Sequence, residues 1–206
     1  YAQLMNAWEP PLELRCLMWR QLDELSEAYV FWSFNGNWAN EMNRNDHNVI
    51  CGKIVNASVT GTSSNRANPF VMLAPAETTE DAGDCFGVNL IYSGNHYEAC
   101  EYNAFGKLRL VSGINPMGFS YQIGVGESFE SPEAVMTYSP DGYNGMSQNM
   151  HAFVRECIVR GTWKKKERPV LLNSWEAAYF DINERKLLKL AKAARDVGIE
   201  LFVIDD

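Results

Sequence analysis

The chain has 206 residues, of which 46% are hydrophobic and 21% are charged, and its formal net charge at pH 7 is -8. These proportions are ordinary for a folded globular protein, and the length allows one large domain or one and a half, with a substantial core. The negative charge argues against nucleic acid as a partner, because phosphate binding depends on clustered Lys and Arg.

The five cysteines are odd in number and widely spaced, at positions 16, 51, 85, 100 and 157, with no Cys-x-x-Cys. This pattern predicts reduced thiols and a cytoplasmic protein rather than a disulfide framework. No stretch approaches the roughly 20 apolar residues of a membrane helix, and there is no signal-peptide pattern, so no membrane partner is expected. The chain begins at Tyr1 without a methionine, which predicts a fragment of a larger protein.

Residues 1 to about 140 are predicted to form short strands separated by turns. Apolar and aromatic runs indicate the strands, at 12–19, 29–34, 50–60, 70–73, 85–92, 108–114 and 119–125. Turn-forming residues lie between them, at 35–37, 61–65, 93–95 and 115–116. Many short strands at this spacing predict an antiparallel β-sandwich over residues 1–145.

A helical linker is predicted over residues 146–168. Apolar residues recur at three- and four-residue intervals between Met146 and Arg160, which indicates one helix. Before it, Ser131 to Ala134 is expected to form a helix start or a turn. After it, the basic run Lys164 to Lys166 is expected to be solvated, because Glu167 follows it and no further basic cluster is near.

Residues 169–206 have the pattern of a strand, a helix and a second strand. The helix is predicted over 183–197, with Asn183 as its N-cap and Gly198 as its terminator. The apolar run 199–204 indicates a strand buried on both faces. A crossover of this length joins parallel strands, so this segment is expected to be the first β-α-β unit of a parallel α/β domain whose remainder is missing.

Polar residues and a tryptophan follow the two predicted parallel strands. Trp175 comes after the first strand, and Asp205 and Asp206 come after the second. Strand carboxyl ends carry the site in parallel α/β barrels. An indole face covers the C–H surface of a sugar and carboxylates accept hydrogen bonds from its hydroxyls, so these residues predict a sugar site. A core tryptophan beside a solvated Asp-Asp loop is the structural alternative.

These residues resemble the start of the catalytic barrel of glycoside hydrolase family 36 α-galactosidases. The similarity includes Val170 to Asp181 and Gly198 to Asp206. Upstream segments match in family order and extend the resemblance over nearly the whole chain, at 34–39, 63–70, 92–95, 113–116, 126–133 and 138–139.

The resemblance implies a fold and an activity. The fold would be the later part of the family's amino-terminal β-sandwich, followed by the start of a (β/α)8 TIM barrel. The activity would be that of a melibiase in carbohydrate metabolism, a hydrolase that releases terminal α-linked galactose from melibiose or raffinose with retention. The resemblance implies no cofactor, a cytoplasmic location and a homo-oligomer, with a tetramer as one option.

The resemblance also implies roles for particular residues. Asp205 and Asp206 would bind galactose hydroxyls, Trp175 would wall the sugar subsite, and Trp38 would add an aromatic contact from a sandwich loop. Both catalytic aspartates would lie beyond residue 206, so no catalytic residue is assigned here and the fragment alone is expected to be inactive. Neighbours on one strand point to opposite faces, which argues against Asp205 and Asp206 as the catalytic pair.

Two departures put the finer substrate preference in doubt. After Trp38, many relatives carry Arg-Glu-Arg or similar, whereas this chain has Ala39 to Arg44. Relatives often place His-Gln after the paired serines, where this chain has Asn65 and Arg66. Both loops are implied to lie in or near the pocket.

Other functions remain open from the sequence. A non-catalytic carbohydrate-binding β-sandwich fits the aromatic-rich strands, and an α-galactosyl transglycosylase or α-N-acetylgalactosaminidase would share the fold. The three histidines, His47, His96 and His151, have no Cys or carboxylate at metal-ligand spacing, so no metal site is predicted.

Overall fold

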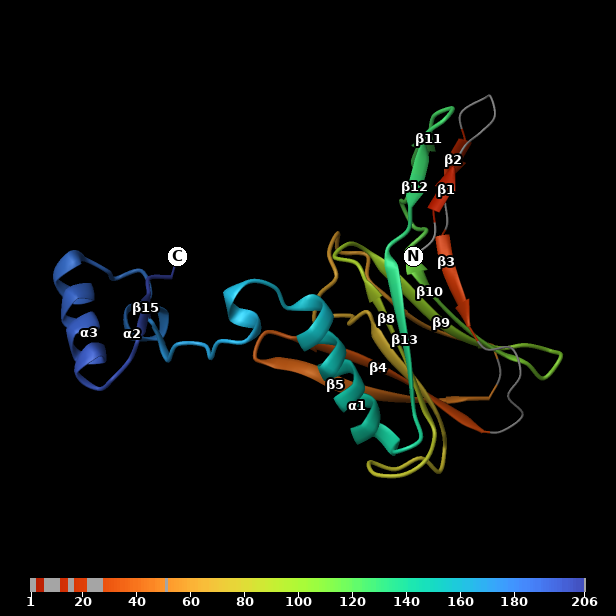
Figure 1. The fold of residues 1–206 in the computed structure, drawn as a ribbon, viewed down its shortest axis with the longest axis horizontal. Coiled ribbons are helices and arrows are strands. Elements are labelled where there is room, and N and C mark those ends of the chain that lie inside the picture. Colours follow the sequence, from red (N-terminus) through yellow and green to blue (C-terminus); the bar gives the residue numbers. More distant parts are fainter. Residues whose placement is uncertain (1–2, 6–11, 15–16, 22–27, 51, 206) are drawn as a thin grey trace. The chain divides into compact units, whose positions relative to one another are not determined.

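The computed structural model describes residues 3–5, 12–14, 17–21, 28–50 and 52–205, which form two units, residues 1–152 and 153–206. The first unit contains a five-stranded antiparallel sheet of order β13-β8-β7-β4-β5 (Figure 1). Its strands are β4 (Tyr29–Asn37), β5 (Asn40–Val49), β7 (Phe70–Pro75), β8 (Cys85–Ile91) and β13 (Glu133–Ser139).

A four-stranded antiparallel sheet of order β3-β10-β9-β6 forms the second layer of this unit. Its strands are β3 (Leu17–Gln21), β6 (Gly52–Ala57), β9 (His96–Tyr102) and β10 (Leu108–Ile114). Two short antiparallel strand pairs complete the described strands of this unit. They are β1 (Gln3–Met5) with β12 (Ser128–Glu130), and β2 (Leu12–Leu14) with β11 (Tyr121–Ile123).

The inner faces of the two larger sheets share one hydrophobic core. Phe31 and Leu73 of the five-stranded sheet belong to the same buried cluster as Leu108 and Leu110 of the four-stranded sheet. Side chains alternate between the faces of a strand, so every second residue contributes to this core. The predicted antiparallel sandwich is confirmed.

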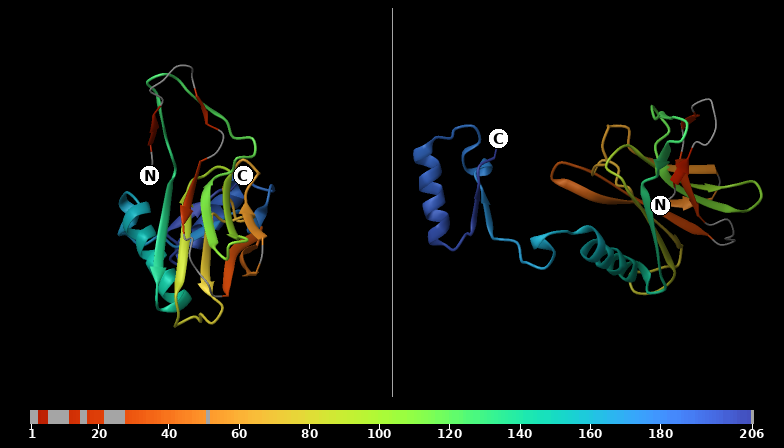
Figure 2. Two further views of the ribbon diagram at one scale, coloured as in Figure 1. Left: turned by 90° about the vertical axis from the view of Figure 1, so that its right-hand side faces the viewer. Right: turned by 45° about the horizontal axis from the view of Figure 1, so that its top comes forward.

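Helix α1 (Gly142–Phe153) covers the outer face of the five-stranded sheet, as the views in Figures 1 and 2 show. The rings of Trp32 and Tyr143 lie 3.9 Å apart between centroids. A Cβ added at Gly87 would lie 2.6 Å from Met146 Sδ, so a larger residue there would force Met146 to shift. Because β7 lies between the core and this helix, most of its residues are buried.

The structure differs from several local predictions in the first unit. The predicted helix 146–160 starts earlier, at Gly142, and ends at Phe153, after which Val154–Ile158 form a π-helical turn. The segment 131–134 is not a helix start, because β13 begins at Glu133 and pairs with β8. The predicted strand 12–19 is two strands, β2 and β3, with residues 15–16 between them outside the described range.

Two strands had no apolar signal in the sequence. β5 is an edge strand with mostly exposed polar residues, and β4 is its strand partner. β9 lies inside the four-stranded sheet but buries His96 and Glu98 where apolar residues would be expected. The turn predicted at 35–37 lies slightly later, at Trp38 and Ala39, because β4 continues through an irregular pairing to Asn37.

The second unit has the predicted strand–helix–strand order. β14 (Leu171–Asn173) and β15 (Leu201–Val203) pair in parallel, with α2 (Trp175–Ala178) and α3 (Glu184–Asp196) between them in sequence. A short 3-10 helix, Thr162–Lys164, precedes β14. The N-cap prediction is confirmed, since Asn183 accepts a hydrogen bond from the Lys186 backbone N–H at 3.0 Å. Gly198 adopts a φ of 87°, as expected for a helix terminator.

The prediction that 199–204 is buried on both faces is wrong for this unit. Leu201 is 41% exposed and Ile204 is 57% exposed. Among the described residues, β15 pairs with β14 in a two-stranded sheet. The other edge of β15 and part of one of its faces therefore have no covering element.

Candidate functional site

The carboxyl ends of β14 and β15 bring together the polar residues that follow them. Asn173 Nδ2 donates a hydrogen bond of 2.9 Å to Asp205 Oδ2. The two strands are parallel, so their carboxyl ends meet at one edge. Asp206, the second carboxylate predicted for this site, lies outside the described residues.

The Asn173 side chain has a defined orientation because both ends of its amide are used. Its Oδ1 accepts a hydrogen bond from the backbone N–H of Trp175 at 2.8 Å, while its Nδ2 donates to Asp205. Asn173 therefore couples the start of α2 to the carboxylate, a role that the sequence did not single out.

Ser174 forms hydrogen bonds that link the carboxyl ends of β14 and β15. Its backbone N–H donates to the carbonyl oxygen of Val203 at 2.9 Å, and its buried Oγ accepts from the backbone N–H of Asp205 at 3.3 Å. These bonds hold Asp205 next to Asn173.

Trp175 is half-buried at the start of α2, in an aromatic group with Tyr179 and Phe180. Its ring contacts both edge-on, with centroid distances of 5.3 Å to Tyr179 and 4.9 Å to Phe180. Tyr179 has a φ of 46°, a strained conformation for a non-glycine residue that tends to occur at functional positions. Tyr179 and Phe180 are themselves exposed, so this aromatic group lies at the surface of the second unit.

Trp38 belongs to the first unit, whereas Trp175 and Asp205 belong to the second. It lies in the turn of the β4–β5 hairpin and is 87% exposed. The adjacent Ala39 has a φ of 56°, and its backbone N–H donates to Glu41 Oε1 at 2.9 Å. The hairpin thus presents an indole to solvent at its tip, which is unusual for so large an apolar side chain.

The connection between β6 and β7, residues 58–69, lies against this hairpin. Asn35 Nδ2 donates to the carbonyl oxygen of Arg66 at 2.5 Å. The backbone N–H of Asn68 donates to the carbonyl oxygen of Phe34 at 2.9 Å, and Asn68 Nδ2 donates to Met42 Sδ at 3.4 Å. The hairpin and this connection are therefore neighbours.

A fully buried, hydrogen-bonded histidine–glutamate pair contacts the same connection. His96 Nδ1 is 2.7 Å from Glu98 Oε2, and both side chains are 0% exposed. Burial would lower the pKa of His96, but the hydrogen bond and charge of Glu98, together with the Ala67 carbonyl, outweigh it and raise that pKa. Burial raises the pKa of Glu98 to about 6, although His96, Asn56 and Ser112 act against it. His47 and His151, in contrast, are exposed.

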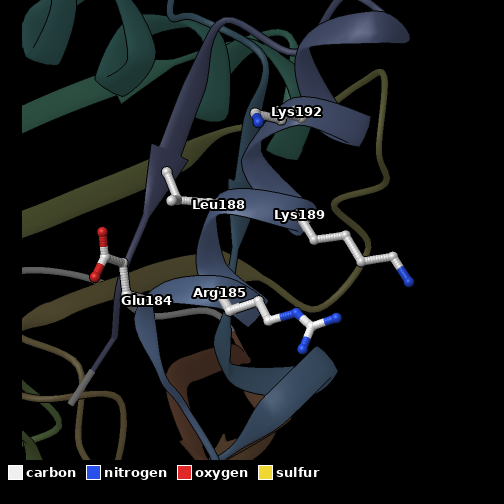
Figure 3. A pocket seen from close by; sticks show the side chains of 5 residues that line it. All are labelled: Glu184, Arg185, Leu188, Lys189 and Lys192. Atoms are coloured by element: carbon white, nitrogen blue, oxygen red, sulfur yellow. The ribbon is translucent and has the colours of Figure 1, made fainter.

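The described residues also form open depressions with volumes between about 250 and 670 Å³. No three of their His, Cys, Asp or Glu side chains gather as a metal site would require. None of their helices combines the length and apolar content that crossing a membrane requires. One depression, of about 550 Å³, lies on α3, where Arg185 and Lys189 extend outward (Figure 3). Its lining comes from this one helix and is mostly charged: Glu184, Arg185, Leu188, Lys189 and Lys192.

Comparison with known proteins identifies the family. Residues 1–124 match the Glycosyl hydrolase family 36 N-terminal domain, and residues 128–206 match Melibiase. The chain belongs to glycoside hydrolase family 36.

Two curated relatives cover almost the whole chain. Alpha-galactosidase AgaA of Geobacillus stearothermophilus is 42% identical over 205 residues, 100% of this chain and 28% of that protein. Alpha-galactosidase 1 of Pediococcus pentosaceus is 38% identical over 204 residues, 99% of this chain and 28% of that protein. The chain thus spans 28% of the length of these relatives.

Solved structures show the same fold. The α-galactosidase AgaB from Geobacillus stearothermophilus matches with a TM-score of 0.92 and 37% identity, over 99% of this chain and 28% of that one. A variant of AgaA from that organism, in complex with raffinose, matches with a TM-score of 0.95 and 36% identity, over 99% of this chain and 28% of that one. The fold class predicted from the sequence is confirmed.

Proposed function

We propose that this chain is part of an α-galactosidase that releases terminal α-linked galactose from oligosaccharides such as raffinose and melibiose. The observation that carries the proposal is the Asn173–Asp205 pair beside Trp175, at the strand ends of a family 36 chain. A relative of this family binds raffinose, and its structure matches this chain closely.

Asp205 serves as a binding residue for galactose hydroxyls. Among the described residues, Asn173 is the hydrogen-bond partner of the Asp205 carboxylate. It bonds Oδ2, which leaves Oδ1 for a sugar hydroxyl. Hydrogen bonds that involve a charged group are about twice as strong as neutral ones, so the carboxylate contributes affinity as well as orientation. Asp206 would supply a second carboxylate to the same sugar.

Trp175 and Trp38 provide the aromatic surfaces of the proposed pocket. A galactose ring carries an apolar C–H face, which packs on an indole, while its hydroxyls need polar partners. Near Trp175, the side chains of Asn173 and Asp205 provide such polar partners.

The catalytic carboxylates are proposed to lie on barrel strands beyond residue 206. In the retaining scheme, one carboxylate attacks the anomeric carbon while the other protonates the departing oxygen, and water then cleaves the glycosyl ester with help from that second group as base. Their carboxyl groups lie about 5–5.5 Å apart in such enzymes. Asp205 and Asp206 are therefore assigned to sugar binding and not to this catalytic pair.

The domain organisation follows from the same proposal. Residues 1–152, which include nearly all of α1, form the later part of the amino-terminal sandwich, 153–168 the connection, and 169–206 the start of a (β/α)8 barrel; the linker predicted at 146–168 is thus shortened, because α1 packs on the sheet. The exposed Leu201 and Ile204 support this reading, because further strands of a barrel would cover them.

We further propose a cytoplasmic homo-oligomer, with a tetramer as one option. Cys85, Cys100 and the exposed Cys157 are free thiols, which persist in a reducing compartment. Light scattering of the full-length protein tests the oligomeric state.

The direct test of the activity is hydrolysis of nitrophenyl α-galactoside by the full-length protein. We expect release of nitrophenol and of galactose, and galactose release from raffinose. Galactose transfer to an added acceptor sugar in place of hydrolysis would instead indicate a transglycosylase. A protein that neither hydrolyses the substrate nor binds galactose would contradict the proposal.

A further inference from the structure

A buried polar cluster closes one end of the sandwich core. Glu98 of β9 lies directly opposite Asn56 of β6 on one side and Ser112 of β10 on the other. Cross-strand partners share a face, so all three side chains point inward, and His96, two residues before Glu98, does so as well. Asn56 Nδ2 donates to Glu98 Oε2 at 3.0 Å, and Ser112 Oγ donates to Oε1 at 3.5 Å.

The hydrogen bonds of His96 require one proton to be shared with Glu98. Nε2 lies 2.7 Å from the carbonyl oxygen of Ala67, and a carbonyl accepts only, so Nε2 carries a hydrogen. Nδ1 then either donates to an ionised Glu98 or accepts from a protonated one. Either arrangement satisfies both buried groups with one shared proton.

This cluster contacts the β6–β7 connection at two consecutive carbonyl groups. His96 donates to Ala67 O, and Asn56 Nδ2 donates to Asn68 O at 2.7 Å. On its other side the connection contacts the β4–β5 hairpin, through Asn35 and the Arg66 carbonyl. Asn35 in turn accepts from Asn45 Nδ2 at 2.6 Å, which joins both strands of the hairpin to the connection.

We propose that His96 is a positioning residue for substrate binding: through Ala67 it fixes residues 61–68, which carry Arg66, against the hairpin that carries Trp38. The inference rests on the proposed function, because it assigns to these two loops a place at the sugar site. His96 is fully buried and bonds the Ala67 carbonyl of the β6–β7 connection, so it acts through Ala67 and not on the sugar.

Two substitutions separate the two bonds of His96. In asparagine the amide nitrogen is as many bonds from Cα as Nδ1 is, so His96→Asn keeps the donor to Glu98 and loses the one to Ala67. In glutamine the amide nitrogen corresponds to Nε2, so His96→Gln keeps the donor to Ala67 and loses the one to Glu98. His96→Gln removes the partner of the buried Glu98 carboxylate, which is the larger loss to the fold. A purely structural role would therefore affect His96→Gln at least as much as His96→Asn.

We expect His96→Asn in the full-length protein to raise KM for nitrophenyl α-galactoside about tenfold with little change in kcat, since a buried hydrogen bond that is lost has an effect of this order. We expect His96→Gln to keep KM within about twofold of the wild type. His47→Gln, at an exposed histidine, is the control. Equal KM values for the Asn and Gln variants would overturn the inference.

Hydrogen exchange provides a readout that does not depend on activity. In the same full-length proteins, the amides of residues 61–68 should exchange faster in His96→Asn than in His96→Gln. If the wild type lacks α-galactosidase activity, the proposed function fails while this comparison still tests the positioning role. Equal exchange in the two variants would show that His96 does not hold the connection.

Discussion

At the scale of single residues, Asp205 is the side chain on which the proposed sugar site depends most. Asp205→Asn in the full-length protein should lower kcat/KM about 10- to 100-fold, because a hydrogen bond to a charged group contributes about 1.5–3 kcal/mol. Steady-state kinetics and galactose titration calorimetry measure the effect. Asp196→Asn, at an exposed carboxylate on α3 paired with Arg195, is the matched control and should leave both unchanged. Similar kinetics for the two variants would exclude Asp205 from the site.

The His96–Glu98 pair also makes stability depend on pH. The pKa of His96 is raised above 6.5 in the folded protein, so the folded state holds more protons than the unfolded state above that pH. The contribution of this raised pKa to the free energy of unfolding is therefore complete below pH 6.5. It is lost as pH rises through the folded pKa, at a rate of at most about 1.4 kcal/mol per pH unit. The pKa of Glu98 is raised to about 6, so its contribution to stability is likewise lost as pH rises, but over a lower pH range.

Urea unfolding of the wild type and of the double variant His96→Gln/Glu98→Gln, in which neither member of the pair titrates, measures this dependence between about pH 6 and 9. The free energy of unfolding of the wild type should fall relative to that of the variant as pH rises. A difference that stays constant or grows with pH would contradict the assignment. From β6, β10 and the β6–β7 connection, the groups that contact the pair are Asn56, Ser112 and Ala67, none of which titrates.

At the scale of elements, the contact between α1 and the five-stranded sheet depends on Gly87. Gly87→Ala should destabilise the protein by about 1–3 kcal/mol, since the new methyl group would overlap Met146 Sδ in a packed interface. Met146→Ala alone should cost about 2–5 kcal/mol as a cavity mutation. In the double variant the overlap is absent, so its loss of stability should be less than the sum, as measured by denaturant unfolding. Strict additivity would show that the two residues do not meet.

The elements that the sequence predicted correctly are those with a strong local signal. Asn183 and Gly198 mark the ends of α3 by side-chain capping and positive φ, both of which depend on neighbours in sequence. β5 was missed because, as an edge strand, it keeps polar side chains in water, which removes the alternating pattern. The helix predicted from Met146 begins at Gly142 instead, because Gly142 and Tyr143 bond to the distant residues Gly83 and Thr79.

At the scale of the whole molecule, Trp38 is the residue of the first unit for which a role in sugar binding is proposed. Trp38→Ala should raise KM about three- to tenfold and leave the melting temperature unchanged, because the side chain is 87% exposed and contributes little to the fold. Phe105→Ala is the control, since Phe105 is an aromatic residue in another turn of the same unit and is 88% exposed. Equal effects of the two substitutions on KM would remove Trp38 from the proposed site.

By itself the sequence determined the fold class, the strand–helix–strand order of the second unit, and the residue types at the strand ends. These follow from side-chain periodicity, capping and turn chemistry, which act over a few residues. The tertiary structure alone decided that Asn173 orients Asp205 and that His96 and Glu98 form a buried pair beneath the β6–β7 connection. Those contacts depend on which strands become neighbours and how deeply they are buried, and the burial that raises the pKa of Glu98 exists only once two distant sheets have packed together.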